Sequence, residues 1–305
     1  MADQSGRVAV VGSLNADLTI RVERFPEPGE TLTGSELVVA PGGKGSNQAA
    51  AAAVLGSSVR LVGAVGADDH GSFLLAEARR AGVDVEGVRR LSDHATGTAM
   101  IVVDQAGENT IIVSPGANGA LSPELISLES LGDPSVLCLC LEVPLDTVAA
   151  AARLGRSVGV TVLLNLSPYA AVGSDLLELA DVLLVNRSEA ALLLSVDTLP
   201  DDIADWPELP VARTVVTLGG DGAVVVDVSE PGGKRLTPIP PTSVDVVDTT
   251  GSGDAFTGGL AHRLAAGDSL VEAAWFAARA GALAATRSGA QSCYAALVDI
   301  STQAF

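Results

Sequence analysis

Near its C-terminal end the chain reads Asp248-Thr249-Thr250-Gly251-Ser252-Gly253-Asp254-Ala255-Phe256-Thr257-Gly258-Gly259-Leu260. Turn-forming residues and two glycines one residue apart are followed by apolar residues at helical spacing, so this segment predicts a loop that leads directly into a helix. The first N–H groups of a helix have no partner within it, and the helix dipole adds partial positive charge there. Because glycines let the backbone approach a ligand closely, a phosphate group fits this helix start.

Asp254 stands among these groups and needs its own explanation, because a carboxylate repels a phosphate. A hydroxyl that attacks a γ-phosphate must lose its proton to a nearby group, and general base is the natural role for Asp254. The alternative is an aspartate that only caps the helix after a glycine-rich turn. Neither Lys-Ser nor Lys-Thr follows the glycines, so the loop is not a Walker A motif.

The segment resembles the C-terminal signature of the ribokinase-like (PfkB) family of carbohydrate kinases, Asp-Thr-x-Gly-Ser-Gly-Asp-Ala-Phe-x-Gly-Gly-Leu. In that family the last aspartate of the signature accepts the proton of the sugar hydroxyl, and the Gly-Ser-Gly amides hold the transition-state charge. The resemblance therefore implies catalytic roles for Asp254, Gly251, Ser252 and Gly253. It also places Gly253 and Asp254 beside the ATP.

Composition and charge narrow the range of partners. The 305 residues are 48% hydrophobic but only 3% aromatic, and 37 acidic against 18 basic side chains give a net charge of −19. This charge repels nucleic acid and anionic membrane surfaces, so neither is expected as a partner. Met1 to Arg7 shows no signal peptide, and no uncharged apolar run of about 18 residues occurs, so we expect a cytoplasmic protein.

The three cysteines are expected to be buried thiols in a reducing compartment. Cys138 and Cys140 lie two residues apart in an apolar run, and Cys293 stands alone near the C-terminus. A metal site is the alternative, but no second Cys or His pair completes a ligand set.

Strands and helices alternate along most of the chain with short links, which predicts an α/β fold with a mostly parallel sheet covered by helices on both faces. We expect one domain over residues 1–305, with residues 197–210 as a surface segment. Alternating apolar and polar residues at about 15–40 and 97–114 predict two hairpins. The other predicted strands are 7–14, 59–65, 136–143, 160–166, 182–185, 214–218 and 223–228, and the helices are 71–81, 123–131, 145–156 and 269–286.

The resemblance implies a ribokinase-like arrangement in which the two hairpins form a small β-sheet lid. In the family this lid covers the sugar and often pairs with a second subunit, which implies a homodimer. Periodicity by itself indicates only the strands.

Two polar residues, Asn15 and Asp17, follow the first predicted strand at its carboxyl end, where open α/β sheets bind their ligands. Their side chains point the same way from an extended segment and can both bond one polyhydroxylated molecule. An Asx turn that ends the strand is the alternative.

The loop Pro41-Gly42-Gly43-Lys44-Gly45-Ser46-Asn47 precedes an alanine-rich helix and by itself could be a second phosphate nest or a plain capping loop. It resembles the family's N-terminal signature, which implies that Gly43, Lys44 and Asn47 bind sugar hydroxyls. Glu142 could start a turn at Val143-Pro144, but it matches a sugar-binding glutamate of the family.

Two later segments match the family's nucleotide site. Asn186-Arg187-Ser188-Glu189 matches its Asn-x-x-Glu motif, which implies contact with ATP through Asn186 and with the water shell of Mg²⁺ through Glu189. A capping box fits the same spacing. Thr-x-Gly-x-x-Gly lies along the nucleotide in the family, and a hairpin turn is the alternative. The matching residues here are Thr217, Leu218, Gly219, Gly220, Asp221 and Gly222.

Family members that need a monovalent cation hold it between the first signature's loop and a later turn. K⁺ is the expected ion, because a large, weakly hydrated ion suits a ring of carbonyls. The matching positions are Asp248, Thr250, Ala284, Arg287, Gly289 and Cys293. Cys293 departs from the family's usual serine, and a thiol is a poor ligand for a hard cation.

The combined resemblance implies ATP-dependent phosphorylation of D-ribose at its 5-hydroxyl, with Mg²⁺. One alternative is a family kinase that acts on deoxyribose, fructose or a nucleoside. A second alternative, of another class, is a catalytically silent sugar or nucleotide sensor on the same fold.

Overall fold

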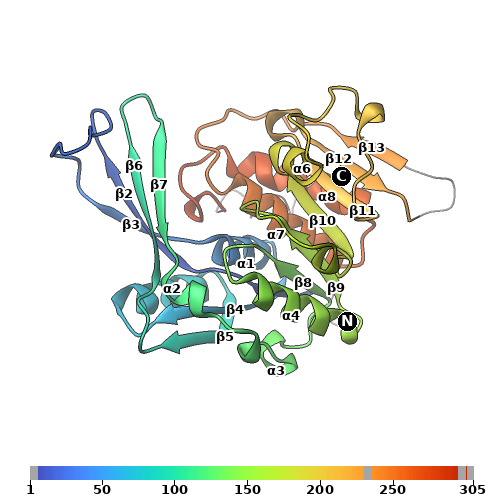
Figure 1. Ribbon diagram of the computed structural model, residues 1–305, viewed down its shortest axis with the longest axis horizontal. Helices are drawn as coiled ribbons and strands as arrows, with labels where there is room; N and C mark the ends of the chain where they lie inside the picture. Colours follow the sequence, from blue (N-terminus) through green and yellow to red (C-terminus); the bar gives the residue numbers. More distant parts are fainter. Residues whose placement is uncertain (1–5, 230–234, 295–299, 301–305) are drawn as a thin grey trace.

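The computed structural model describes residues 6–229, 235–294 and 300, and within them the chain forms two β-sheets (Figure 1). The larger sheet has the strand order β13-β12-β11-β10-β9-β8-β1-β4-β5. Its strands are parallel from β11 to β5, and β12 and β13 are antiparallel at the other edge. Their bounds are β1 Arg7–Val11, β4 Ser58–Gly66, β5 Val83–Leu91, β8 Val136–Leu139, β9 Thr161–Asn165, β10 Val182–Asn186, β11 Arg213–Thr217, β12 Ala223–Asp227 and β13 Arg235–Ile239.

Helices cover both faces of this sheet because alternate strand residues point to opposite sides. In β8, Leu137 and Leu139 pack on one side and Cys138 packs on the other. The first side is covered by α3 (Leu128–Leu131), α4 (Leu145–Ser157), α5 (Ser174–Leu177) and α6 (Arg187–Leu193). The second side is covered by α1 (Lys44–Val54), α2 (Asp69–Arg80), α7 (Ser252–Ala265) and α8 (Leu270–Ala284).

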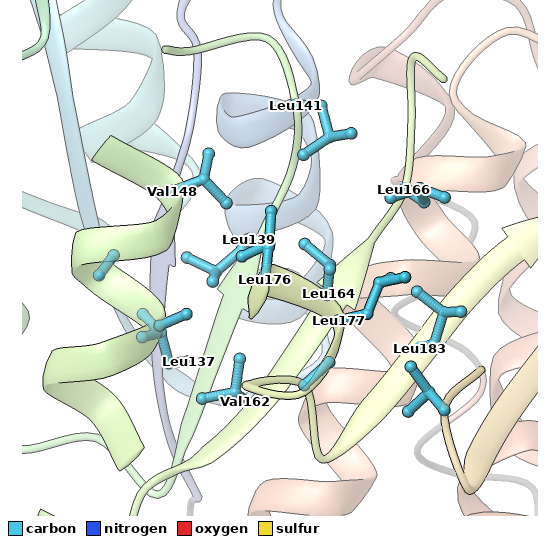
Figure 2. Packing of buried hydrophobic residues seen from close by; sticks show 14 of the residues in the cluster. Leu137, Leu139, Leu141, Val148, Val162, Leu164, Leu166, Leu176, Leu177 and Leu183 are labelled. Carbon is cyan, nitrogen blue, oxygen red and sulfur yellow. The ribbon is translucent and has the colours of Figure 1, made fainter. Parts of the chain in front are cut away.

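The core on the first side is built from leucine and valine side chains. Figure 2 shows Leu137 and Leu139 of β8 beside Val148 of α4 and Leu176 of α5. All four side chains are buried. This apolar burial on both faces confirms the α/β fold expected from the sequence.

The smaller sheet has the order β3-β2-β6-β7 and stands away from the larger one in Figure 1. Its strands are β2 Asn15–Arg21, β3 Val38–Gly42, β6 Gly97–Val103 and β7 Asn109–Ser114. β2 follows β1 after a three-residue link, so this sheet begins at the carboxyl end of a central strand. These are the strands expected near residues 15–40 and 97–114.

Several local predictions were wrong. The helix expected at residues 123–131 is split into a 3₁₀ turn, Pro123–Leu125, and the short α3, because Ile126 is extended and Ser127 caps a new helix. The strand expected to reach Val143 ends at Leu139, so Glu142 lies in the loop that follows it. β5 and β13 were not predicted.

The segment 197–210 is more buried than its prolines and acidic residues suggested. Leu199 and Trp206 are only 2% and 4% exposed, and both join the core on the first side of the sheet. The Trp206 indole donates a hydrogen bond to the Pro200 carbonyl at 2.8 Å. Burial of these side chains therefore fixes the segment to the domain.

In the part of the chain that the structure describes, every helix is too short or too polar to cross a membrane. Residues 1–5, where we expected no export signal, lie outside the described residues.

Candidate active site

The start of α7 has the open backbone that its sequence predicted. Gly251 is the N-cap, with φ 79, a left-handed conformation that favours glycine. A Cβ at this position would also collide with the Ala290 carbonyl oxygen. The Tyr294 hydroxyl donates to the Gly251 carbonyl at 3.3 Å, so the turn is held from the C-terminal side.

Ser252 and Gly253 follow in the first turn of α7. Ser252 Oγ is buried and has no hydrogen-bond partner among the described residues. A Cβ placed on Gly253 would meet no atom within 4 Å. The Ser252 N–H donates to the Thr249 carbonyl at 3.1 Å. The unpaired hydroxyl, the open space and the start of the helix together suit an anion.

The Asp254 carboxylate lies where α7 meets the start of α1. Its Oδ2 accepts a hydrogen bond from Asn47 Nδ2, and its Oδ1 accepts one from Gln48 Nε2, both at 3.0 Å. Asp254 is 8% exposed. Gly258 permits this approach, because a Cβ there would lie 2.6 Å from the Ala51 Cβ. The structure thus brings Asn47 and Asp254 together, as the sequence interpretation required.

The side-chain amide of Gln291 orients Asn47. Gln291 Nε2 donates to Asn47 Oδ1 at 2.9 Å and to Ser46 Oγ at 3.0 Å. Since Oδ1 of Asn47 receives this donor, its Nδ2 is the atom that faces Asp254.

Glu142 lies beside the start of α1. Its Oε2 accepts from the Lys44 backbone N–H at 2.9 Å and from the Ser13 hydroxyl. Gly43 is the N-cap of α1 and packs closely on the link between β1 and β2. A Cβ on Gly43 would lie 2.8 Å from the Asn15 backbone nitrogen. These contacts bring Asn15, Gly43, Lys44 and Glu142 to one place.

The site carries a cluster of acids around one lysine. Burial, and then the neighbouring carboxylates of Glu142 and Asp254, raise the pKa of Asp17 from 3.8 to about 7. Burial would lower the pKa of Lys44, but the charges of Asp254 and Glu142 outweigh it and raise that pKa above its usual value. Lys44 is therefore the cation that balances these carboxylates.

Asn15 is oriented by Asn118, a fully buried residue after the lid strands. Asn118 Nδ2 donates to Asn15 Oδ1 at 2.8 Å and to the Leu14 carbonyl at 3.0 Å, and Asn118 Oδ1 accepts from the Leu14 N–H. This arrangement leaves the Asn15 amide nitrogen as the group that can donate to a ligand.

The residues expected at the nucleotide lie on two neighbouring strands. Asn186, at the end of β10, is the register partner of Thr217 at the end of β11. Asn186 and Glu189 form the capping box of α6, with two hydrogen bonds of 2.8 Å. One oxygen of each side chain thus accepts from the backbone N–H of the other residue, an arrangement compatible with contact to a metal ion through water.

The turn after β11 is open on one side. A Cβ on Gly219 or Gly220 would meet nothing within 4 Å, whereas Gly222 packs against the Ile239 carbonyl. Leu218 N donates to the Gly222 carbonyl at 2.8 Å, which closes the turn that includes Asp221. The strands on either side are antiparallel, so the hairpin interpretation of this segment is confirmed.

The residues expected to hold a monovalent cation come from two loops in contact. Asp248 accepts from Thr250 N at 2.9 Å and from Gly289 N at 3.0 Å. These hydrogen bonds lower the pKa of Asp248, against the opposing effect of burial. The Ala284 carbonyl accepts from Arg287 N at 3.3 Å in the same turn.

Cys293 reaches the cation-site loops through its thiol. Its Sγ lies 3.9 Å from the Thr250 carbonyl oxygen and 3.7 Å from that of Ala290. Burial raises the pKa of this thiol to about 11, so it is protonated at neutral pH. The donor set fits a weakly bound monovalent ion, with a neutral thiol where an oxygen would serve better.

No group of three or more His, Cys, Asp or Glu side chains within the described ranges is arranged to hold a metal ion. All three cysteines are free and buried, as expected.

Three residues were absent from the expected site: Ser13, Gln48 and Gln291. Gln48 had a signal in the sequence, since it is a polar residue next to Asn47 in an alanine-rich helix. Ser13 and Gln291 act on other side chains through the tertiary structure, which local patterns do not reveal.

A family model and the sequences of curated proteins relate this chain to the same family of kinases. A family model described as pfkB family carbohydrate kinase matches residues 5–297. A ribokinase from Haemophilus influenzae is 36% identical over 292 residues, which cover 93% of this chain and 94% of the relative.

Solved structures of ribokinases also match this chain. A ribokinase from Arabidopsis thaliana, complexed with ribose and ATP, matches with a TM-score of 0.87 and 31% identity over 98% of this chain and 100% of that chain. A ribokinase from Cryptococcus neoformans in complex with ADP matches with a TM-score of 0.80 and 30% identity over 98% and 99% of the two chains. The likeness therefore includes both sheets and every segment of the site.

Proposed function

The chain belongs to the pfkB family of carbohydrate kinases, and from this premise we propose that it transfers the γ-phosphoryl group of ATP to the 5-hydroxyl of D-ribose. The products are D-ribose 5-phosphate and ADP. The observation that carries the proposal is the buried Asp254 carboxylate, which lies at the open start of α7 and is hydrogen-bonded to Asn47. The relatives named above are ribokinases, and two of them are structures, one with ribose and ATP and one with ADP.

Asp254 is the general base in this proposal. Its carboxylate accepts the proton of the 5-hydroxyl while the sugar oxygen attacks the γ-phosphorus, and the bond from phosphorus to the bridging oxygen of ADP breaks. The N–H groups of Gly251 and Gly253, with the Ser252 hydroxyl, donate to the oxygens on which negative charge is concentrated. The open space at Gly253 supports this role.

The acidic cluster and its lysine bind the sugar. Asn15 and Asn47 offer amide donors, Asp17 and Glu142 offer acceptors, and Lys44 neutralises part of their charge. The main chain at Gly43 approaches closely enough to contribute. Mixed donors and acceptors of this kind suit adjacent hydroxyl groups.

The nucleotide lies along the carboxyl ends of β10 and β11. Its partners are Asn186, the turn residues from Thr217 to Gly222, and Gly253 with Asp254 at the phosphates. Mg²⁺, when bound with ATP, neutralises phosphate charge. Glu189 contacts its water shell, in keeping with the capping box that occupies both side chains.

A monovalent cation, K⁺, binds between the loops at Asp248 and Gly289. Asp248 contributes a carboxylate, and Thr250, Ala284, Arg287, Gly289 and Cys293 contribute main-chain oxygens. The hydrogen bonds that join Asp248 to both loops support the shared site. Such an ion would fix the loop that precedes Gly251.

The smaller sheet acts as the lid of a single functional domain. Asp17 pairs in register with Ala40 and Ala99, so the face of the lid that carries these residues is directed at the site. Closure of this face over the sugar would exclude water from the phosphoryl transfer.

The opposite lid face forms the interface of a homodimer. Val39, Leu18, Met100 and Ile112 are successive register partners across all four strands and so lie on the face away from Asp17. Met100 and Ile112 are 57% and 66% exposed. An exposed apolar row on a soluble chain's sheet supports pairing with a second copy.

We place the protein in the cytoplasm, where ATP is available and where its three free thiols remain reduced. Nucleic acid is not expected as a partner, since the net charge is −19.

The test is ADP release with Mg-ATP and a panel of D-ribose, deoxyribose, fructose and nucleosides, with and without K⁺. The proposal expects the highest kcat/KM with D-ribose and a product phosphorylated on O5. A higher kcat/KM for another acceptor would identify a different kinase of the family. Binding of sugar without ADP release would indicate a catalytically silent sensor.

A further inference from the structure

Gln48 is a buried amide to which the proposed reaction has not yet assigned a role. Its Nε2 donates to Asp254 Oδ1 at 3.0 Å, and its Oε1 accepts from the Cys138 thiol at 3.4 Å. Gln48 is 0% exposed, so both ends of the carboxamide are used inside the protein. The thiol at Oε1 leaves Nε2 as the atom that faces Asp254.

We propose that Gln48 is a positioning residue that, held by Cys138, fixes the plane of the Asp254 carboxylate for proton transfer. This inference rests on the proposed function, because it concerns the same base. Gln48 acts through Asp254 and needs no contact with the substrates.

The first argument is geometric. Asn47 and Gln48 are successive residues at the start of α1, and each holds one oxygen of Asp254. Asn47 also faces the proposed sugar site, whereas Gln48 is enclosed on the sheet side by Cys138. Two donors on two oxygens prevent rotation of the carboxylate about its last side-chain bond, so its free lone pairs keep one direction.

The second argument concerns the charges beside the base. The charges of Asp17 and Lys44 both interact with that of Asp254. The Gln48 amide, shielded from water, holds Asp254 without adding a charge to this group.

The third argument concerns what holds Gln48. Cys138 belongs to β8 at the centre of the larger sheet, and burial raises the pKa of its thiol well above the usual value. The thiol is thus a permanent donor to Gln48 Oε1. The chain of contacts from Cys138 to Gln48 to Asp254 ties the central sheet to α1 and α7.

The direct test compares Gln48→Met and Gln48→Glu with the wild type in ribose phosphorylation. Methionine keeps the length of the side chain but removes the donor, so we expect kcat to fall about 10-fold, with KM for ATP changed less than about twofold. The KM for ribose should also change less than about twofold, because Gln48 acts through Asp254 and does not contact the substrates. Glutamate replaces the donor with a charged acceptor beside the Asp254 carboxylate, so it should lower kcat further.

A second pair of variants tests the thiol. Cys138→Ser keeps a donor, whereas Cys138→Ala frees the carboxamide, so kcat should be lower in the alanine variant than in the serine variant, by less than the loss in Gln48→Met. Thr147→Val is the matched control, because it removes a buried hydroxyl of α4 that donates to the Leu121 carbonyl, on the opposite side of the larger sheet from Cys138. It should lower the Tm and leave kcat unchanged.

A wild-type kcat in folded Gln48→Met and Gln48→Glu would overturn the inference. If neither variant folds, the Cys138 pair decides, and equal kcat values for the serine and alanine variants would overturn it. Wild-type turnover of ribose separates this outcome from failure of the proposed function. A wild type that releases no ADP with ribose would reject the function itself.

Discussion

Asn47 Nδ2 lies 3.0 Å from Asp254 Oδ2, although 207 positions of sequence separate the two residues. The contact joins the start of α1, which carries the sugar-binding signature, to the start of α7, which carries the phosphate-binding signature. A carboxylate at this junction can serve a sugar hydroxyl and a phosphoryl group at once. The kinase assignment depends on this arrangement.

Replacing Asp254 tests the role of the base. Asp254→Asn should lower kcat for ribose by at least about 10²-fold, because the amide cannot accept the hydroxyl proton. Stability should change little, since a less favourable contact with Asn47 and Gln48 is offset by reduced repulsion from Asp17 and Glu142. Initial rates measure kcat, and thermal unfolding measures stability. A kcat within threefold of the wild type would remove Asp254 from this role.

Asp17→Asn should stabilise the fold in a pH-dependent way. The pKa of Asp17 is raised from 3.8 to about 7, so the folded protein keeps a proton that the unfolded chain releases between these values. Stability contributed by this group therefore falls as pH rises from about 4 to about 7, by up to about 4 kcal/mol. The variant should unfold at a higher Tm than the wild type at pH 8.

The same variant separates stability from binding. At pH 3 the Tm difference between Asp17→Asn and the wild type should vanish, because Asp17 is then protonated in the folded state and largely so in the unfolded state. The KM for ribose should rise while the KM for ATP changes little. A Tm difference that does not depend on pH would contradict the account of Asp17.

The close packing of α1 on α7 predicts a penalty for a single added methyl group. Gly258→Ala would place its Cβ 2.6 Å from the Ala51 Cβ and 2.9 Å from the Ala52 nitrogen. We expect a loss of about 1–3 kcal/mol in the free energy of unfolding. The added methyl group should also move the Asp254 carboxylate away from the Asn47 and Gln48 amides, which should lower kcat at least about 10-fold.

Gly119→Ala is the control for that prediction. Its Cβ would lie 3.4 Å from the Pro115 Cβ, an ordinary contact far from α7 in sequence. Denaturant unfolding and ribose turnover should both stay close to the wild type. Equal effects of the two substitutions would show that α1 and α7 do not need this contact.

Cys293→Ser tests the cation site. A hydroxyl beside the Thr250 carbonyl can bind a hard cation in addition to the main-chain oxygen of residue 293, which the neutral thiol does poorly, so the K⁺ concentration for half-maximal activation should fall. Cys138→Ser, a thiol of the central sheet, is the control and should leave K⁺ activation unchanged. An unchanged K⁺ dependence in Cys293→Ser would place the cation elsewhere.

The lid interface predicts a change of oligomeric state. Ile112→Glu introduces a charge in the apolar row on the outer lid face, where Ile112 is 66% exposed, and should convert a dimer to monomers. Leu192→Glu, at an exposed position of α6, should not. Sedimentation equilibrium distinguishes the two, and a monomeric wild type would reject the interface.

The fold and family followed from the sequence because their signals are local. The signature at residues 248–260 and the alternation of strands and helices identified a covered parallel sheet, which the structure and its relatives confirm. β5 was missed because charged residues interrupt its apolar pattern at the sheet edge. The burial of Leu199 and Trp206 was missed because prolines and acids around them suggest a surface segment.

Resemblance to the family identified the expected site residues. The structure adds the contacts that orient their side chains. Asn118 and Gln48 orient Asn15 and Asp254 through contacts between residues more than 100 positions apart. Such contacts leave no period or spacing in the sequence. The roles of the site residues accordingly stay predictions.

The most direct measurement is a crystal structure with D-ribose, Mg²⁺ and a non-hydrolysable ATP analogue. The account predicts the ribose 5-oxygen within about 2.6–3.2 Å of an Asp254 carboxylate oxygen. It also predicts the terminal phosphate at the N–H groups of residues 251 and 253. Ribose bound with its 5-oxygen turned away from Asp254, or a terminal phosphate remote from α7, would contradict it.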